Sequence, residues 1–111
     1  MKTVFQKIID GELPAEKVFE NERVLAIKDI APHTPVHLLI IPKKHIASIS
    51  EVTEEDIPLL GECLLIASQL AKQFHIEDGF RVLTNNGTDA GQTVFHLHFH
   101  LLGGRPLQHL V

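Results

Sequence analysis

The sequence predicts an α+β fold with a five-stranded, mostly antiparallel sheet, one long helix and one short helix, formed by residues 1–111 as a single domain. Strand-like segments stand before and after one long helical pattern, and this order favours that class. A length of 111 residues with 44% hydrophobic and 22% charged residues suits one globular core and excludes a disordered chain.

A short helix and a hairpin are predicted at the start of the chain. Thr3 and Gln6 match a capping box, and the apolar residues that follow keep helical spacing until Gly11. Residues 16–20 and 23–29 are rich in strand-forming residues and are separated by only two positions. We therefore predict that they form an antiparallel hairpin.

A buried strand and the long helix follow. Residues 36–41, V-H-L-L-I-I, lie between two prolines and predict a strand that is buried on both faces. Helical spacing extends from about Thr53 to His75, and Pro58, a residue suited to the first turn, places the start of regular helix near Ile57. The stripe expected to face the core comprises Ile57, Leu60, Leu64, Ala67, Ala71 and Phe74.

The same helix carries more apolar residues than one stripe requires. The additional residues are Leu59, Cys63, Leu65, Ile66 and Leu70. A helix that is apolar on more than one face is expected to bury a second surface, so we predict a homodimer contact there. The alternative is a small sheet that wraps this helix more fully.

Charge and cysteine content limit the partners. The formal net charge of −4 gives no electrostatic footprint for long nucleic acid, although it is compatible with a nucleotide monomer. Cys63 is the only cysteine, which excludes an internal disulfide and fits a reducing compartment. No apolar stretch approaches the roughly 20 residues of a membrane helix, and no signal-peptide core is present. We expect a cytoplasmic protein without a membrane partner.

Histidines dominate the end of the sequence. Residues 80–84 and 93–102 predict the last two strands, and the turn-rich residues 85–91 connect them. Side chains alternate along a strand, so the apolar residues of H-L-H-F-H-L-L should pack while three imidazoles share the other face. These imidazoles belong to His96, His98 and His100. Their strict alternation beside a glycine-rich loop favours a functional site over a row of surface histidines.

Two chemistries fit this pattern. Alternate histidines could supply two zinc ligands, with His37 or His33 as the third and water in the open position. Alternatively, one neutral imidazole could attack phosphorus and form a covalent intermediate. The loop offers small side chains and backbone N–H groups to a phosphate, whereas neither a Walker motif nor G-x-G-x-x-G occurs. The residue pattern alone leaves both chemistries open.

The run H-L-H-F-H-L-L at 96–102 resembles the signature of the histidine triad (HIT) superfamily, and N-N-G-T-D-A-G-Q-T-V-F-H before it resembles the histidine triad nucleotide-binding (Hint) branch. Residues 5–16 and 28–46 and the ending L-L-G-G-R also match, so the resemblance covers nearly the whole chain. It implies a homodimeric HIT-like fold that hydrolyses purine nucleoside 5′-phosphoramidates of the AMP-amine type without a cofactor or metal, with aminoacyl adenylates as a further candidate substrate.

The resemblance also implies a role for each residue of the catalytic motif. His98 is the implied nucleophile that takes the nucleoside monophosphoryl group. His100 and His96 would contact phosphate oxygens and orient the nucleophile, with His37 as a fourth, supporting histidine. Thr93 stands where the family often has serine and would place a hydroxyl near the leaving amine, although its extra methyl group stiffens the side chain.

The implied substrate contacts fall into three groups. Asp29 would bind the two ribose hydroxyls, although the same residue could merely cap a turn. The phosphate and leaving group would lie near Asn85, Gly91, Gln92 and Val94. The apolar base pocket would comprise Phe5, Ile8, Leu13, Ile27 and Ile30. The remaining histidines, read as structural or solvated, are His33, His45, His75 and His109.

Departures from the family pattern leave the leaving group open. The ending R-P-L-Q-H-L-V lacks the tryptophan that some relatives carry, and His100 stands where the nucleotidyl-transferase branch has glutamine. Water is therefore the expected acceptor. The alternatives are a dinucleoside polyphosphate hydrolase of the same superfamily, a zinc-dependent hydrolase and a non-catalytic module that binds nucleotides.

Overall fold

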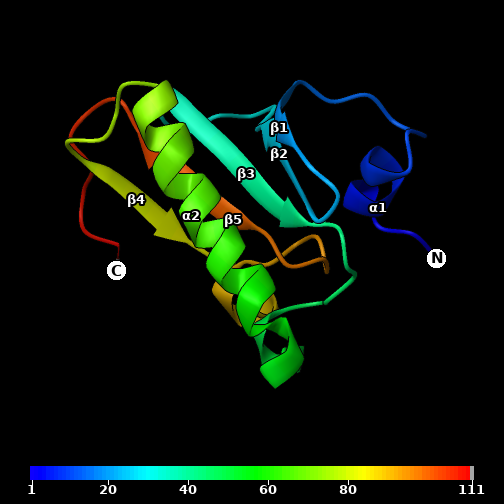
Figure 1. The fold of residues 1–111 in the computed structure, drawn as a ribbon. Helices are drawn as coiled ribbons and strands as arrows, with labels where there is room; N and C mark the ends of the chain where they lie inside the picture. Colours follow the sequence, from blue (N-terminus) through cyan, green and yellow to red (C-terminus); the bar gives the residue numbers. More distant parts are fainter. Residues whose placement is uncertain (111) are drawn as a thin grey trace.

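One sheet organises the molecule, for which a computed structural model describes residues 1–110. All pairs of neighbouring strands are antiparallel, and the strand order is β1-β2-β3-β5-β4. The strands are β1 (Lys17–Glu20), β2 (Val24–Lys28), β3 (Val36–Pro42), β4 (Phe80–Leu83) and β5 (Phe99–Gly103). The helices are α1 (Val4–Ile9) and α2 (Ile57–Gln73) (Figure 1). The predicted α+β class is confirmed.

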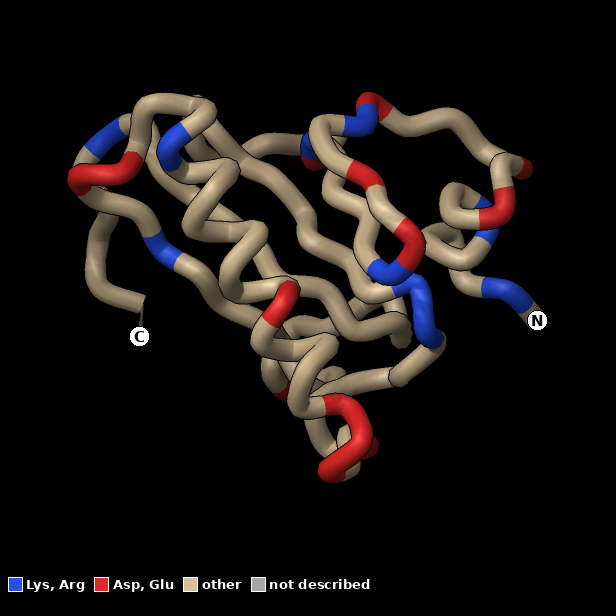
Figure 2. Tube along the Cα trace, viewed as in Figure 1, with Lys and Arg blue, Asp and Glu red and all other residues tan. Residues whose placement is uncertain are grey.

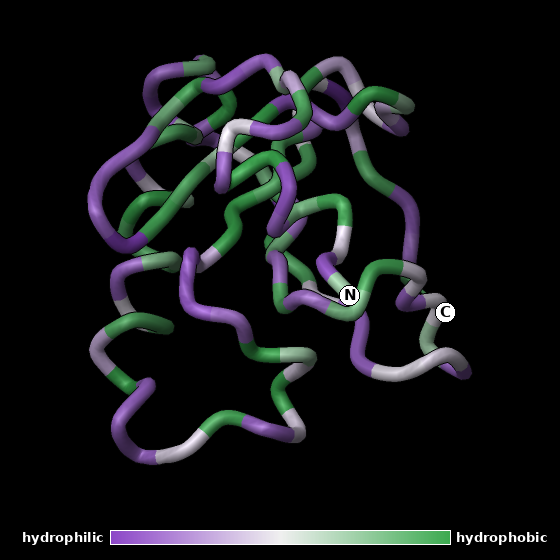
Figure 3. Tube along the Cα trace, turned by 90° about the vertical axis from the view of Figure 1, so that its right-hand side faces the viewer, coloured by the Kyte–Doolittle hydropathy of each residue, from purple (hydrophilic) through white to green (hydrophobic). Residues whose placement is uncertain are grey.

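The two central strands, β2 and β3, are buried on both faces because a helix covers each side of this part of the sheet. The residues that face α2 include Val24, Ala26, Leu38 and Ile40. The residues between them face α1 and form a second cluster of Phe5, Ile8, Leu25, Ile27, Leu39 and Ile41. The hydrophobic run predicted to be doubly buried is therefore confirmed. Figure 3 shows hydrophobic stretches meeting inside the molecule.

The short helix α1 begins as its capping box predicts. The Thr3 hydroxyl accepts a hydrogen bond from the Gln6 N–H at 3.2 Å, and the Gln6 side-chain oxygen accepts one from the Thr3 N–H at 2.7 Å. Six residues are too few for a helix that is stable alone, so packing of Phe5 and Ile8 onto the sheet supports it. This packing places the ring of Phe5 beside the histidines.

The long helix α2 starts at Ile57, as predicted, with Pro58 in its first turn. Its buried face differs from the predicted stripe, because the side chain of Ile57 is 64% exposed and that of Leu64 is 51% exposed. Helical spacing identifies apolar faces but not which of two such faces meets the sheet. The face that packs on the sheet comprises Cys63, Ile66, Ala67, Leu70 and Ala71.

The last strand is shorter than predicted, since β5 begins at Phe99 and not at Thr93. β3, its neighbour, ends at Pro42, and the β3 pairing reaches only from Val36 to Ile40, so no strand ladder extends to residues 93–98. The predicted alternation nevertheless persists, because Leu97, Phe99 and Leu101 all pack in the cluster with α2. The histidines between them face the other way.

Charged residues lie mainly in loops and at the ends of elements, as Figure 2 shows, with an acidic group just before α2. Within residues 1–110, no helix combines the length and apolar character needed to span a bilayer. The cellular location stays a prediction.

Candidate active site

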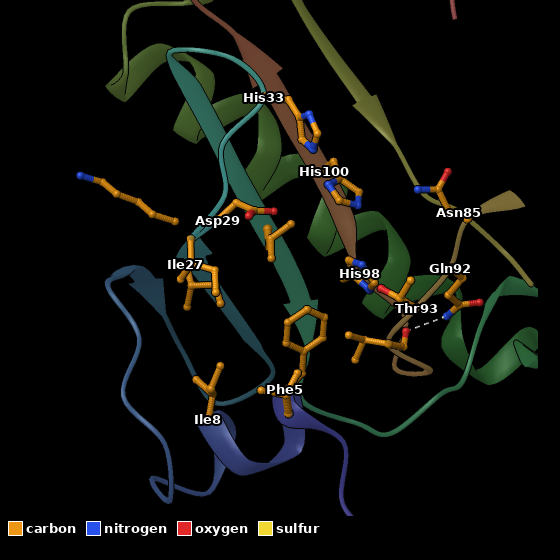
Figure 4. A pocket seen from close by; sticks show the side chains of 16 residues that line it. Phe5, Ile8, Ile27, Asp29, His33, Asn85, Gln92, Thr93, His98 and His100 are labelled. Atoms are coloured by element: carbon orange, nitrogen blue, oxygen red, sulfur yellow. Dashed lines mark hydrogen bonds between the residues drawn. The ribbon is translucent and has the colours of Figure 1, made fainter. Parts of the chain in front are cut away.

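A cavity of about 480 Å³ lies on the α1 side of the sheet. Figure 4 shows Phe5, Ile8 and Ile27 at one end, Asn85, Gln92 and Thr93 at the other, and His98 and His100 along the wall between them. The α1 helix, the end of β2, the 85–94 segment and the start of β5 therefore contribute to one site, although they are far apart in the sequence.

The apolar end of the cavity is lined by four of the five residues expected to contact the base, namely Phe5, Ile8, Ile27 and Ile30. Leu13 does not line the cavity, because it lies beyond α1 and is 40% exposed. Val4 and Leu39 line it without having been predicted. A signal for Leu39 existed, because it stands two positions after His37 and a strand turns both side chains to one face.

The polar end brings together the other predicted substrate residues, which are Asp29, Asn85, Gly91, Gln92, Thr93 and Val94. Lys28 and His33 also line the cavity. Lys28 was not predicted there, and His33 was considered only as a third ligand in the zinc alternative. The position of each depends on where the end of β2 and the loop before β3 lie in the folded chain.

The ring of His98 is fixed by one hydrogen bond. Its Nδ1 donates to the carbonyl oxygen of His96 at 2.7 Å, which leaves the lone pair on Nε2. Nε2 of His98 has no hydrogen-bond partner among residues 1–110. Within this part of the chain, every buried side-chain nitrogen or oxygen has a partner, so Nε2 of His98 is not buried and is accessible from the cavity. Burial lowers the pKa of His98, which favours the neutral, nucleophilic ring. Phe5 packs edge-on against that ring, with centroids 4.8 Å apart.

His100 receives its tautomer from a chain of hydrogen bonds. The backbone N–H of His33 donates to Nδ1 of His37 at 3.1 Å, so the proton of the neutral His37 ring lies on Nε2. That Nε2–H lies 2.9 Å from Nδ1 of His100 and donates to it. The proton of His100 is consequently on Nε2. Burial lowers the pKa of His100 to about 4, so the ring is a neutral donor.

His37 itself does not line the cavity, and it acts from behind His100. Its Nε2 also lies 3.4 Å from a carboxylate oxygen of Asp29. Burial nevertheless lowers the pKa of His37, and the nearby Asp29 carboxylate only partly opposes this effect. His37 therefore supports the site as a neutral ring.

The expectation that the His96 ring contacts phosphate is wrong. Its side chain is fully buried, its Nε2 donates to the carbonyl oxygen of Pro42 at 2.7 Å, and its Nδ1 lies 3.3 Å from Nδ1 of His45. Both ring nitrogens are thus engaged inside the protein. The expectation that His96 orients the nucleophile agrees with the geometry, and the contact is its backbone carbonyl.

Gln92 holds the loop beside the cavity. Its side-chain oxygen accepts from the Gly87 N–H at 2.8 Å, and its amide nitrogen donates to the carbonyl oxygen of Ala47 at 2.8 Å. The same amide nitrogen donates to the carbonyl oxygen of Val94 at 3.0 Å, the bond that Figure 4 shows as a dashed line. Gly91 adopts φ 88°, a left-handed conformation that favours glycine. The loop is therefore shaped by its own bonds before any ligand binds.

Within residues 1–110, one group of possible metal ligands has its atoms within 4.8 Å of one another, and it comprises Asp29, His37 and His100. This group differs from the predicted zinc set, because it contains one of the alternating histidines where the prediction has two, and it adds Asp29. A metal on Nε2 of His37 would require a proton on Nδ1, which instead accepts the His33 N–H. The hydrogen-bond pattern therefore disfavours His37 as a zinc ligand.

Comparison with known proteins agrees with this fold. Residues 10–107 match the family model described as the HIT domain, and the chain belongs to this family. It is 56% identical over 105 residues to a HIT-like protein of Chlamydia pneumoniae, which covers 95% of this chain and 96% of the relative.

Two solved structures are also similar. The crystal structure of a HIT family hydrolase from Legionella pneumophila has a TM-score of 0.95 and 46% identity, covering 96% of each chain. That of a histidine triad nucleotide-binding protein from Candida albicans has a TM-score of 0.82 and 33% identity, covering 99% of this chain and 87% of that one. These matches agree with membership of the histidine triad family.

Proposed function

We propose that this protein hydrolyses purine nucleoside 5′-phosphoramidates through a covalent nucleotidyl-histidine at His98. The observation that carries the proposal is the accessible, unprotonated Nε2 of His98 at the wall of the cavity. The names of the similar structures, a HIT family hydrolase and a nucleotide-binding protein, support the same reaction class and ligand class.

The shape of the cavity supports a mononucleotide. Its volume of about 480 Å³ falls within the range of about 300–1,000 Å³ that is usual for small-molecule sites. The base would lie against Phe5 and Ile27, and the ribose hydroxyls near Asp29. One Asp29 oxygen accepts the Ala31 N–H at 2.8 Å, which orients the carboxylate and still leaves lone pairs on both oxygens for the ribose hydroxyls.

The chemistry divides into two displacements. In the first, the Nε2 lone pair of His98 bonds to phosphorus, the P–N bond to the amine breaks, and its electron pair leaves on the amine, which takes up a proton. In the second, water bonds to phosphorus and releases a proton, while the P–Nε2 electron pair returns to His98. The net reaction consumes one water and yields an amine and a nucleoside monophosphate. His100 donates its Nε2–H to the phosphoryl oxygens, and Thr93 supplies a hydroxyl near the leaving amine.

The experiment is to trap the intermediate. Wild-type protein is mixed with a phosphoramidate labelled in its nucleotide, quenched, and analysed by mass spectrometry for nucleotide attached to His98. We expect an adduct in the wild type and none in His98→Ala, with turnover falling by roughly 10³-fold or more. Full activity of His98→Ala, or turnover without an adduct in the wild type, would refute the proposal.

Three further measurements separate the competing activities. Faster turnover of dinucleoside polyphosphates than of phosphoramidates would favour the related hydrolase branch. Loss of activity after chelation, restored by zinc, would favour the metal mechanism. Tight binding of AMP without turnover of any substrate would indicate a binding module.

We also propose that a second copy of this chain covers the outer face of α2. Three apolar side chains there are largely exposed in the single chain, those of Ile57, Leu64 and Leu65, with 51–64% exposure. Light scattering should give the mass of a dimer for the wild type and of a monomer for Leu65→Asp. A monomeric wild type would refute this part of the proposal.

A further inference from the structure

The backbone around the nucleophile is held by contacts other than strand pairing. His98 precedes β5, so the β3–β5 ladder does not fix it. Segment 42–46, which starts at the last residue of β3, contacts this part of the chain instead. The Leu97 N–H donates to the Ile46 carbonyl oxygen at 2.7 Å, and Nε2 of His96 donates to the Pro42 carbonyl oxygen at 2.7 Å. Segment 42–46 thus holds both the N–H group of the His96–Leu97 peptide and the side chain of His96.

His45 makes the third contact of this segment. Its Nδ1 lies 3.3 Å from Nδ1 of His96, and the two ring centroids are 5.1 Å apart at an interplanar angle of 65°. Since Nε2 of the neutral His96 already donates to Pro42, Nδ1 of His96 carries the lone pair and must accept. His45 is therefore the donor.

Removal of this donor leaves a polar atom without a partner. The side chain of His96 is fully buried, so water does not reach Nδ1 in the structure as it stands. A buried acceptor that loses its donor destabilises its present geometry. Rotation or a tautomer change of the His96 ring would break its bond to Pro42 and leave only the Ile46 contact to hold the peptide whose carbonyl group accepts from Nδ1 of His98.

We infer that His45 is a positioning residue for the reaction, because it fixes the His96 ring and thereby the carbonyl group that orients the His98 nucleophile. This inference rests on the proposed function. His45 does not line the cavity and is itself exposed, so it acts without touching substrate. Its sequence context, K-K-H-I after a buried strand, gave no sign of this role.

The kinetic test compares His45→Ala with His45→Asn, whose side-chain amide can donate from nearly the same place as Nδ1. His109→Ala, which removes another exposed histidine, is the control. We expect His45→Ala to lower kcat by about 10-fold with KM within about twofold of wild type. His45→Asn should recover most of kcat. A change in KM alone, or no recovery with asparagine, would overturn the donor role.

The spectroscopic test needs no substrate. ¹⁵N NMR of the imidazole rings reports which nitrogen carries the proton, and a melting curve confirms that each variant is folded. We expect one tautomer in the wild type, with protons on Nδ1 of His98 and Nε2 of His96, and a mixture in His45→Ala. Unchanged tautomers in folded His45→Ala would overturn the inference. If the wild type cleaves no phosphoramidate yet the tautomers change as expected, the proposed function fails and the positioning contact stands.

Discussion

Nε2 of His37 lies 2.9 Å from Nδ1 of His100, and this hydrogen bond decides which ring nitrogen of His100 carries the proton. His37 can donate only because its other nitrogen accepts the His33 N–H. Burial lowers the pKa of both rings, so the pair is neutral near pH 7. Because His100 is neutral and its N–H direction is fixed, it can bind a phosphoryl oxygen without placing a positive charge beside the His98 nucleophile.

Replacement of His37 with phenylalanine should lower kcat/KM by about 10- to 100-fold. This range corresponds to the loss of one hydrogen bond to a charged group, here the bond from His100 to a phosphoryl oxygen of the substrate. The ring would still fill the space, but Nδ1 of His100 would lose its donor and the His100 proton could move to either nitrogen. Steady-state kinetics measure this effect, with His109→Ala as the control. Activity within about twofold of wild type would show that His100 does not need this donor.

The rate should depend on pH through His98. The unprotonated ring is the reactive form, and burial lowers the pKa of His98 below the ordinary value of about 6.5. As the pH falls, kcat/KM should therefore hold past pH 6.5 and decline only at lower pH. A profile of kcat/KM against pH reports this value for the free protein. A midpoint above 6.5, or a rate that stays flat down to pH 4, would contradict the mechanism.

Stability should decrease in the same acidic range. The pKa values of His37, His96, His98 and His100 are all lowered in the folded protein, by burial above all. Above about pH 6.5 these rings are neutral in both states; below it the unfolded chain binds protons that the folded protein does not. The free energy of unfolding should thus fall as the pH drops from about 6.5 toward 4. Urea titrations across this range measure the slope, which should be shallower in His100→Gln.

Substitution of Gly103 with alanine should destabilise the protein. An added Cβ would lie 2.8 Å from Cδ1 and 3.1 Å from Cβ of Ile76, and the position is buried inside β5. Overpacking of this kind costs about 1–3 kcal/mol. Gly79→Ala is the matched control, because a Cβ there meets nothing within 4 Å. Equal melting temperatures for the two variants would show that Ile76 moves aside without cost.

The sequence predicted most of the site because its chemistry is local. The alternation of histidines at 96–100 and the glycine-rich loop before them lie within 16 residues, and the two-residue alternation expected of an extended chain predicts that the three rings face one side. The family resemblance added Asp29 and the apolar residues of α1, which no local pattern connects to the histidines. The errors were Leu13, the His96 ring, the start of β5 and the face of α2 that meets the sheet.

Those errors have one physical origin, which also separates what the sequence determined by itself from what tertiary structure decided. Periodicity determined the class, the buried strand and the face shared by the histidines, because each depends on bonds and angles between near neighbours. Where β5 begins depends on where its pairing with β3 stops, and which of two apolar faces of α2 is covered depends on the sheet. The tautomer of each ring depends on the hydrogen-bond partner that the fold supplies to it. Only the packed structure brings Pro42 to His96 and His37 to His100, and these contacts decide how the His96 ring is held and which nitrogen of His100 carries the proton.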